Sequence, residues 1–149
     1  AYLTVNNDRI KALRFMRSAY EYGKTDANVV FKYGAMLLKT DDLYRAKEKF
    51  EEAYALDNNL KIALVAIAEC ELKLNKPERA LETLEKCKGI ENTKEFLTIK
   101  LLTYTELYEK NPENIETKNT IIQICDKILE VFGEDDLVNT VREKYSLNI

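Results

Sequence analysis

The sequence predicts an all-α fold, an α-solenoid built from antiparallel helix pairs, and three observations support this prediction. Side chains of the same kind return 34 residues apart, as Ala12, Ala46 and Ala80 do. Apolar residues keep a helical spacing along the chain, and no stretch of similar length alternates as a strand does. The 149 residues include only 4 glycines and 2 prolines, few enough to permit long helices. Because a repeated helix pair buries its apolar stripe only against a neighbouring pair, we expect the pairs to stack.

The repeat appears in three parallel series of positions. The first and third series carry small side chains, and the second carries large apolar ones. The series are Ala12, Ala46 and Ala80; Met16, Phe50 and Leu84; and Ala19, Ala53 and Cys87. Within one unit these positions are three and four residues apart, so they mark one face of a helix.

Turn-forming residues place the helix boundaries. Asn7, Asp41 and Asn75 recur 34 residues apart just before expected helices, where a short polar side chain can accept free N–H groups. Pro77 suits the first turn of its helix, and Gly133 suits a helix end. The expected helices span residues 8–22, 27–39, 43–56, 60–73, 77–88, 94–110, 116–132 and 134–146.

The first residues predict a continuation of the array. Leu3 lies one period before Leu37, so the segment before Asn7 looks like the last turn of a preceding helix. We therefore expect an array that once extended toward the N-terminus, and a chain that is a fragment of a longer protein. The expected location is cytoplasmic.

These residues resemble the tetratricopeptide repeat (TPR) family, whose unit is a pair of antiparallel helices of 34 residues. The stretch 27–60 carries the family pattern most closely, through Gly34, Ala46 and Phe50. In such a pair the small residues allow the two helices to cross closely, and the aromatic residue fills the space between pairs. The resemblance implies a right-handed superhelix that binds other proteins on its concave side.

The whole chain is expected to form a single TPR-like domain. Its predicted parts are a partial repeat at 1–26, repeats at 27–60 and 61–94, a longer degenerate helix pair at 95–133 and a capping helix at 134–149. Within the second full repeat, Glu71 stands where the family has a large apolar residue. Leu102 is likewise larger than the residue expected at a helix crossing.

Composition argues against most catalytic functions. The chain has no histidine, which removes the commonest general base and the commonest transition-metal ligand. It has no glycine-rich phosphate loop and no C-x-x-C pair. Cys70, Cys87 and Cys125 lie in apolar helical runs, which favours buried, reduced thiols. We therefore expect a protein that is not an enzyme and needs no cofactor or metal.

Charge and hydropathy limit the partners. The net charge is −3, and no run of basic residues occurs. A solvated outer face explains the basic residues of the first expected helix better than nucleic-acid binding does. These residues are Arg9, Lys11, Arg14 and Arg17. No apolar run is long enough to span a bilayer. We expect no nucleic-acid partner and no membrane span.

The TPR resemblance implies where a partner would bind. In this family one face of each first helix lines the concave wall. The corresponding residues here are Asn28, Phe31, Ala35, Leu38 and Lys39; Ile62, Val65, Glu69, Leu72 and Lys73; and Phe96, Ile99, Thr103 and Glu106. Most of the large side chains in this set are apolar, and solvated walls seldom carry so many unless something covers them.

Some family members bind the acidic C-termini of heat-shock chaperones through a clamp of lysine, asparagine and arginine. Here Phe31, Ala35, Ile62 and Ala66 occupy corresponding places, so that clamp is absent. We expect the wall to bind a peptide or amphipathic helix of another protein. The alternatives are packing on the parent chain itself, self-association into a homo-oligomer, and a role as the non-catalytic arm of a larger enzyme or regulator.

Overall fold

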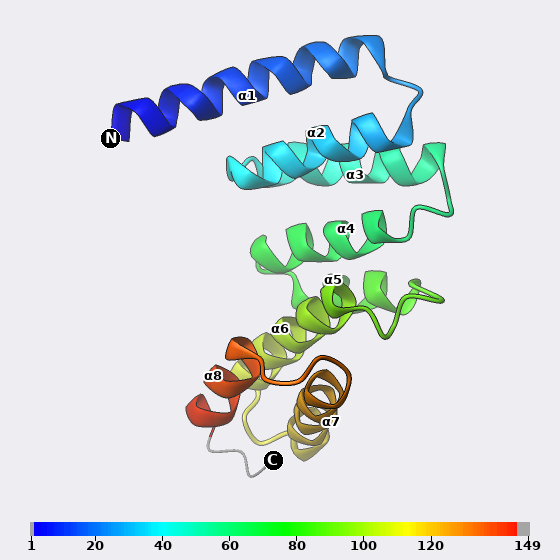
Figure 1. Cartoon of the computed structure of the whole chain (residues 1–149). Helices are drawn as coiled ribbons and strands as arrows, with labels where there is room; N and C mark the ends of the chain where they lie inside the picture. Colours follow the sequence, from blue (N-terminus) through cyan, green and yellow to red (C-terminus); the bar gives the residue numbers. More distant parts are fainter. Residues whose placement is uncertain (1, 146–149) are drawn as a thin grey trace. The chain divides into compact units, whose positions relative to one another are not determined.

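The structure is a computed structural model that describes residues 2–145, with side chains from residue 7 onward. All eight expected helices are present, and no strand occurs among the described residues (Figure 1). The helices are α1 (Tyr2–Tyr22), α2 (Ala27–Lys39), α3 (Leu43–Leu56), α4 (Ile62–Lys73), α5 (Pro77–Glu85), α6 (Lys94–Lys110), α7 (Ile115–Phe132) and α8 (Asp136–Lys144). The predicted all-α fold of helix pairs is confirmed, and α2, α3 and α6 have the predicted boundaries.

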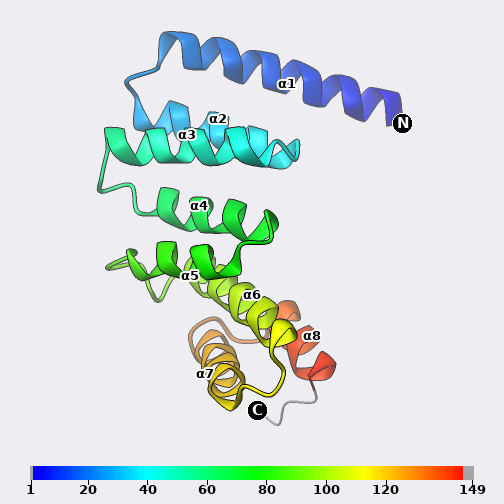
Figure 2. The ribbon, with the colours of Figure 1, turned by 180° about the vertical axis from the view of Figure 1, so that it is seen from behind.

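The helices belong to two compact units, Ala1–Asn75 and Lys76–Ile149. In the first unit, α2 packs against α1 and α3, α3 packs against α4, and α2 also touches α4 (Figure 1, Figure 2). In the second unit, α6 packs against α5 and α7, and α8 packs against α7. The boundary falls inside the predicted repeat 61–94, whose helices α4 and α5 lie in different units.

Helices α2 and α3 cross closely at Gly34. A Cβ atom added to Gly34 would lie 2.9 Å from Cδ1 and Cε1 of Phe50, and 3.3 Å from the carbonyl oxygen of Ala46. The ring of Phe50 is 1% exposed and also packs against Phe31, with ring centroids 5.1 Å apart. Only a glycine leaves room for this ring, which confirms the close crossing expected from the sequence.

The repeated small and apolar positions are less buried on α1 than on α3 and in the α5 region. Ala46, Phe50 and Ala53 on α3 are all buried. Their counterparts one repeat later, from Ala80 through Leu84 to Cys87, are buried as well. The equivalent residues on α1 are only half-buried. These residues are Ala12, Met16 and Ala19. The apolar face of α1 is therefore covered less completely than that of α3.

Helix α1 is attached to α3 through a polar cluster. The Lys49 ammonium donates to the Tyr20 hydroxyl at 3.0 Å, and that hydroxyl donates to a Glu52 carboxylate oxygen at 2.8 Å. Lys49 also lies 3.0 Å from the second Glu52 oxygen. Burial alone would lower the pKa of Lys49, but these hydrogen bonds outweigh it and raise that pKa.

Asp41 and Asn75 end the helices before them, and the prediction that they cap the following helices is wrong. Both have positive φ angles, 64° and 61°. The Asp41 N–H donates to the Leu38 carbonyl, and the Asp42 N–H donates to the Leu37 carbonyl. This is the Schellman pattern, in which a left-handed residue closes a helix. Asp and Asn adopt that conformation more readily than other non-glycine residues, which explains why they recur at this position.

Helix α1 begins earlier than the sequence predicts. It runs without a break from Tyr2 to Tyr22, so Leu3 and Asn7 belong to α1 and not to a turn between two helices. The segment has no glycine or proline, and Asn7 alone does not interrupt a helix. The predictions of a preceding helix end at Leu3 and of a cap at Asn7 are therefore wrong.

Glu71, the departure from the family pattern, forms an ion pair inside the first unit. It is 2% exposed, and its Oε2 atom lies 3.6 Å from Nζ of Lys47 on α3. Lys47 also lies 3.8 Å from Oε1 of Glu51 on its own helix. A charged contact between α3 and α4 thus replaces the apolar contact that the family pattern has here.

The second unit has well-defined helix ends. The Asn114 side chain accepts from the Thr117 N–H at 3.1 Å and caps α7. Gly133, with φ 79°, ends α7 as predicted. Asp135 caps α8 by accepting from the Val138 N–H at 3.0 Å, and it pairs with Lys94 of α6 at 3.1 Å. These bonds hold α8 against the rest of the unit.

The cysteines are free and buried, as predicted. Burial raises the pKa of Cys70 to about 12 and that of Cys125 to about 11, because an apolar environment disfavours the thiolate. In the described part of the chain, no helix is both long and apolar enough to cross a bilayer. No group of acidic or cysteine side chains among residues 7–145 is arranged to hold a metal ion.

Candidate protein-binding site

The predicted wall residues of the first unit lie on two neighbouring helices. We call this region the α2–α4 surface. It consists of Asn28, Phe31, Ala35, Leu38 and Lys39 on α2, and Ile62, Val65, Glu69, Leu72 and Lys73 on α4. The two helices touch each other and run in roughly the same direction (Figure 1). The sequence-based set for this unit is therefore brought together on adjacent helices.

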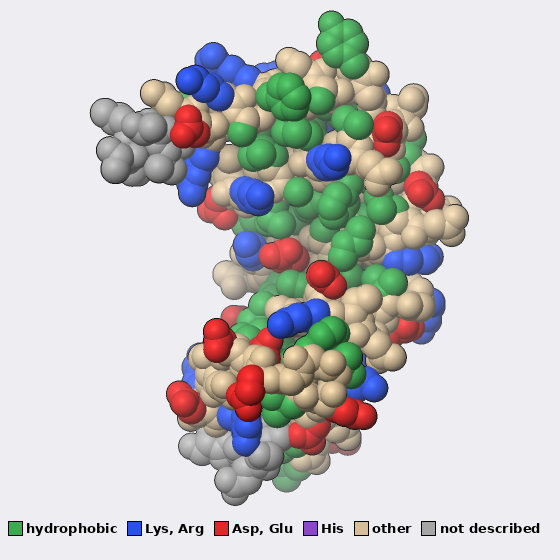
Figure 3. Space-filling model, viewed as in Figure 1, with side chains coloured by type: hydrophobic (Ala, Val, Ile, Leu, Met, Phe, Trp, Pro, Cys, Tyr) green, Lys and Arg blue, Asp and Glu red, His purple; other side chains and the backbone are tan. Residues whose placement is uncertain are grey.

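The centre of the α2–α4 surface is apolar and partly accessible. Phe31 and Leu38 on α2, and Ile62 and Leu72 on α4, are all half-buried. Val65 is only 3% exposed, so it supports the surface from beneath and offers little area of its own. Figure 3 shows hydrophobic side chains gathered over α1, α2 and α4, with lysine and arginine side chains between them.

Two lysines mark one end of the α2–α4 surface. Lys39 and Lys73 are exposed, one repeat apart, in the last turns of their helices. Positive charge is favourable there because the carbonyl end of a helix carries partial negative charge. The Lys73 ammonium also lies 3.8 Å from a Glu69 carboxylate oxygen. A bound segment would thus meet an apolar centre and a charged end.

The remaining predicted wall residues lie on α6, in the second unit. Phe96 and Ile99 are buried, and Thr103 is completely buried with its hydroxyl donating to the Ile99 carbonyl at 2.7 Å. Glu106 is exposed. A continuous wall that joins these residues to the α2–α4 surface stays a prediction.

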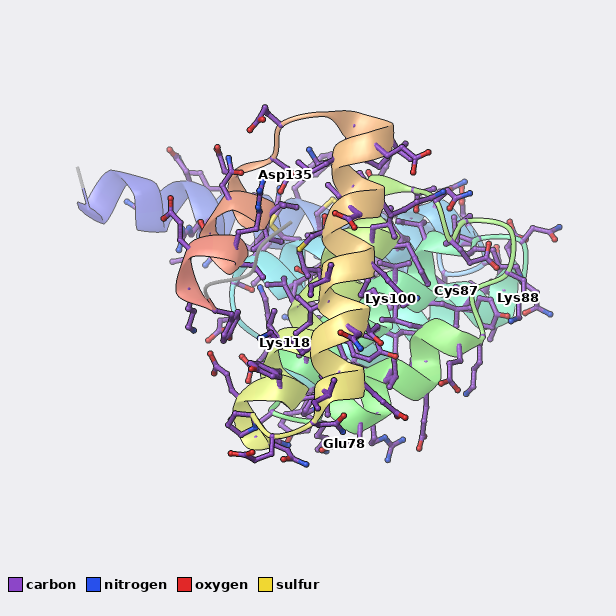
Figure 4. The ribbon with its side chains drawn as sticks, turned by 90° about the horizontal axis from the view of Figure 1, so that it is seen from below. Glu78, Cys87, Lys88, Lys100, Lys118 and Asp135 are labelled. Carbon is purple, nitrogen blue, oxygen red and sulfur yellow. The ribbon has the colours of Figure 1, made fainter. Side chains whose placement is uncertain are left out.

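The second unit has a cleft between α5 and α6 that the sequence did not predict. Its volume is about 240 Å³, and its lining residues are Leu81, Leu84, Glu85, Cys87, Lys88, Glu91, Phe96, Lys100 and Tyr104. Figure 4 shows Cys87 between Lys100 and Lys88 in projection. Burial, with a smaller effect of Glu85, raises the pKa of Tyr104. The available signal was the spacing of Phe96, Lys100 and Tyr104, which places them on one face of α6.

Two clefts in the first unit lie between the beginning of α1 and the end of α2. The larger, of about 440 Å³, is lined by Asp8, Arg9, Ala12, Met36, Lys39 and Thr40. The smaller, of about 230 Å³, is lined by Arg9, Ile10, Leu13 and Thr40. Lys39 thus belongs both to the α2–α4 surface and to a cleft beside α1.

Comparison with known proteins supports the fold. No protein-family model matches the sequence, and no curated protein does. Among solved structures, one described as the MamA RS-1 ArsTM double mutant aligns with a TM-score of 0.68 at 19% identity, over 93% of this chain and 78% of the other. YrrB, described as a TPR protein with an unusual peptide-binding site, aligns with a TM-score of 0.52 at 18% identity, over 95% and 87% of the two chains. The chain therefore has a TPR-like fold.

Proposed function

We propose that this chain is a non-catalytic protein-interaction module that binds a peptide or helix of a partner on the α2–α4 surface. The observation that supports this proposal most strongly is the row of half-buried apolar side chains on two adjacent helices. These side chains are Phe31, Leu38, Ile62 and Leu72. A surface of this kind suits the apolar side of a helix or of an extended segment.

The packing beneath the surface favours recognition by shape. Phe31 rests on the Phe50 ring, which is itself held in the close crossing at Gly34. A side chain fixed in this way loses little conformational freedom when a partner binds, so more of the contact energy appears as affinity. YrrB, a protein with a similar fold, is described as having a peptide-binding site, which agrees with this proposal.

The test is a selection of peptides from a display library on the intact chain, followed by affinity measurements. For a peptide that binds the α2–α4 surface, Ile62→Glu should weaken binding about tenfold or more, because a carboxylate then replaces apolar contact area. Ile62 is at the first position of α4, where an acidic residue is compatible with the helix, so the variant should fold.

Leu56→Glu is the matched control. Leu56 is a 44% exposed leucine at the end of α3, outside the α2–α4 surface. Peptides that lose affinity for Ile62→Glu and keep it for Leu56→Glu support the proposal. If every selected peptide binds Ile62→Glu as tightly as the unchanged chain, the α2–α4 surface is not the binding site.

A further inference from the structure

One flank of α1 carries an apolar stripe whose two aromatic side chains are largely exposed. We define the α1 stripe as Ala12, Phe15, Ala19 and Tyr22, which follow one another at intervals of three, four and three residues. Such spacing places them on one face of the helix. Phe15 is 72% exposed and Tyr22 is 96% exposed, while Ala12 and Ala19 are half-buried. Large and small residues therefore alternate along the stripe.

The repeat shows that this face normally meets another helix. The residue equivalent to Phe15 in the next repeat is Lys49. Its ammonium lies 4.3 Å from the centre of the Tyr20 ring and 6.0 Å from that of the Tyr33 ring. Tyr20 and Tyr33 belong to the two helices that precede α3 in the chain. One repeat later the equivalent residue, Thr83, is buried. The same position on α1 carries a phenylalanine and remains exposed.

Residues 2–8 do not turn back over α1 as the usual repeat geometry would have them do. Residues 2–8 are helical and continue α1. One repeat later the equivalent stretch, residues 36–42, ends α2 and turns the chain into α3. Because α1 has no such turn between Tyr2 and Arg9, residues 2–8 do not lie beside α1 as α2 lies beside α3.

The charge around the stripe indicates the chemistry of the partner. The exposed basic residues of α1 and the turn after it outnumber the acidic ones, although the whole chain has a net charge of −3. The basic residues are Arg9, Lys11, Arg14, Arg17 and Lys24, and the acidic residues are Asp8, Glu21 and Asp26. Glu21 is paired with Lys24 at 3.1 Å. Two copies of α1 packed on each other would bring like charges together, whereas an acidic helix would complement them.

We propose that the α1 stripe binds an acidic amphipathic helix of a partner protein. Large apolar side chains of that helix would pack over Ala12 and Ala19, and Phe15 and Tyr22 would fit between its successive turns, as in other helix pairs. Its carboxylates would lie along the basic edge that contains Lys11 and Arg14. The stripe has other residues than the α2–α4 surface and adjoins it at one end, where Ala12 and Lys39 line the same cleft.

The probe is a fluorescently labelled helical peptide of about 20 residues, long enough to form a helix on binding. Leucine and alanine residues, spaced three and four residues apart, form its apolar face. Glutamate residues occupy the positions that flank this face. A second peptide has lysine in place of every glutamate. Fluorescence anisotropy should show that the acidic peptide binds at least tenfold more tightly than the basic peptide, and that its affinity falls as salt increases.

Two variants locate the binding. Phe15→Glu should weaken binding of the acidic peptide about tenfold or more. Ile115→Glu should not change it, because Ile115 is equally exposed at 72% but lies on α7. A variant that combines Lys11→Glu with Arg14→Glu should reverse the preference and favour the basic peptide. All of these side chains are exposed, so the variants are expected to fold.

Three results would overturn this proposal. One is equal affinity for the two peptides, and another is unchanged affinity after Phe15→Glu. The third is a dimer in sedimentation velocity that Phe15→Glu converts to a monomer, because a second copy of the chain would then occupy the stripe. If Ile62→Glu abolishes binding and Phe15→Glu does not, the peptide binds the α2–α4 surface. The proposed function then stands and the α1 proposal fails.

Discussion

Replacement of Gly34 by alanine should change stability through two opposing effects, a gain in helix propensity and a clash with Phe50. We expect the clash to be the larger. In open space, the substitution would stabilise a helix by roughly 0.5–1 kcal/mol, because alanine is the better helix former. Here the new Cβ would lie 2.9 Å from two ring atoms of Phe50. The ring is 1% exposed and backed by Phe31, so it has little space in which to move.

Overpacking of such a core costs about 1–3 kcal/mol. The net effect of Gly34→Ala should therefore be a loss of about 0.5–2 kcal/mol in the free energy of unfolding, and Gly34→Leu should lose more. The measurement is a urea titration followed by circular dichroism at 222 nm, with thermal melting as a second readout. A loss of 1 kcal/mol lowers the midpoint by about 2–4 °C in a chain of about this size.

The control is a double-mutant cycle with Phe50→Leu. Leucine lacks the ring atoms that the new Cβ would meet, so Gly34→Ala should cost less in the Phe50→Leu background than in the unchanged chain. A coupling energy of at least about 0.5 kcal/mol is expected for two side chains in contact. If Gly34→Ala is as stable as the unchanged chain or more stable, α2 and α3 do not cross as closely as described.

Three further predictions concern charge. Lys47→Ala should lower the free energy of unfolding by about 1–3 kcal/mol, because it removes the cation beside buried Glu71. Urea titration should show a smaller loss when Lys47→Ala is made in a Glu71→Leu background. The raised thiol pKa values, about 12 for Cys70 and about 11 for Cys125 against 9.0, mean that the unfolded chain ionises first. Stability should fall as pH rises above about 9, and less steeply in Cys70→Ala. Peptides bound to the α2–α4 surface should show weak salt dependence in fluorescence titrations, whereas those bound to α1 should show a strong one.

The sequence predicted the helices well because their signals are local. Apolar spacing and the scarcity of glycine and proline identified every helix, and three helices kept their predicted ends. The sequence predicted that Asp41 and Asn75 mark helix boundaries, but they end the preceding helix and do not cap the following one. A short polar residue can begin a helix or close one in the left-handed conformation, and only the backbone angles distinguish the two.

The contacts between helices were predicted only where the repeat implied them. The crossing at Gly34 and Ala46 followed from the repeat pattern and is confirmed, whereas the contact of Gly34 with the Phe50 ring was not predicted. The Lys47–Glu71 pair did not follow, because an acidic residue at an apolar position does not show which neighbouring helix supplies the cation. The cleft beside Tyr104 depends on how α5 and α6 pack, which helical spacing alone does not determine.

The proposed site was predicted in part. The residues of the α2–α4 surface lie on adjacent helices, as their spacing of one repeat implies. Their accessibility could not be derived in the same way, since Ile62 and Val65 look alike in the sequence although only Val65 is buried. Burial depends on the helices that pack around α4. Most side chains of α4 are buried.

The central claim, that a partner segment binds across α2 and α4, is tested most directly by methyl NMR. Isoleucine, leucine and valine methyl groups would be labelled, and a selected peptide would be titrated into the chain. The account predicts the largest shift changes at Leu38, Ile62 and Leu72, with little change at Ile121 and Ile128 in the core of the second unit. Saturable binding that leaves the methyl groups of Leu38, Ile62 and Leu72 unchanged would contradict it.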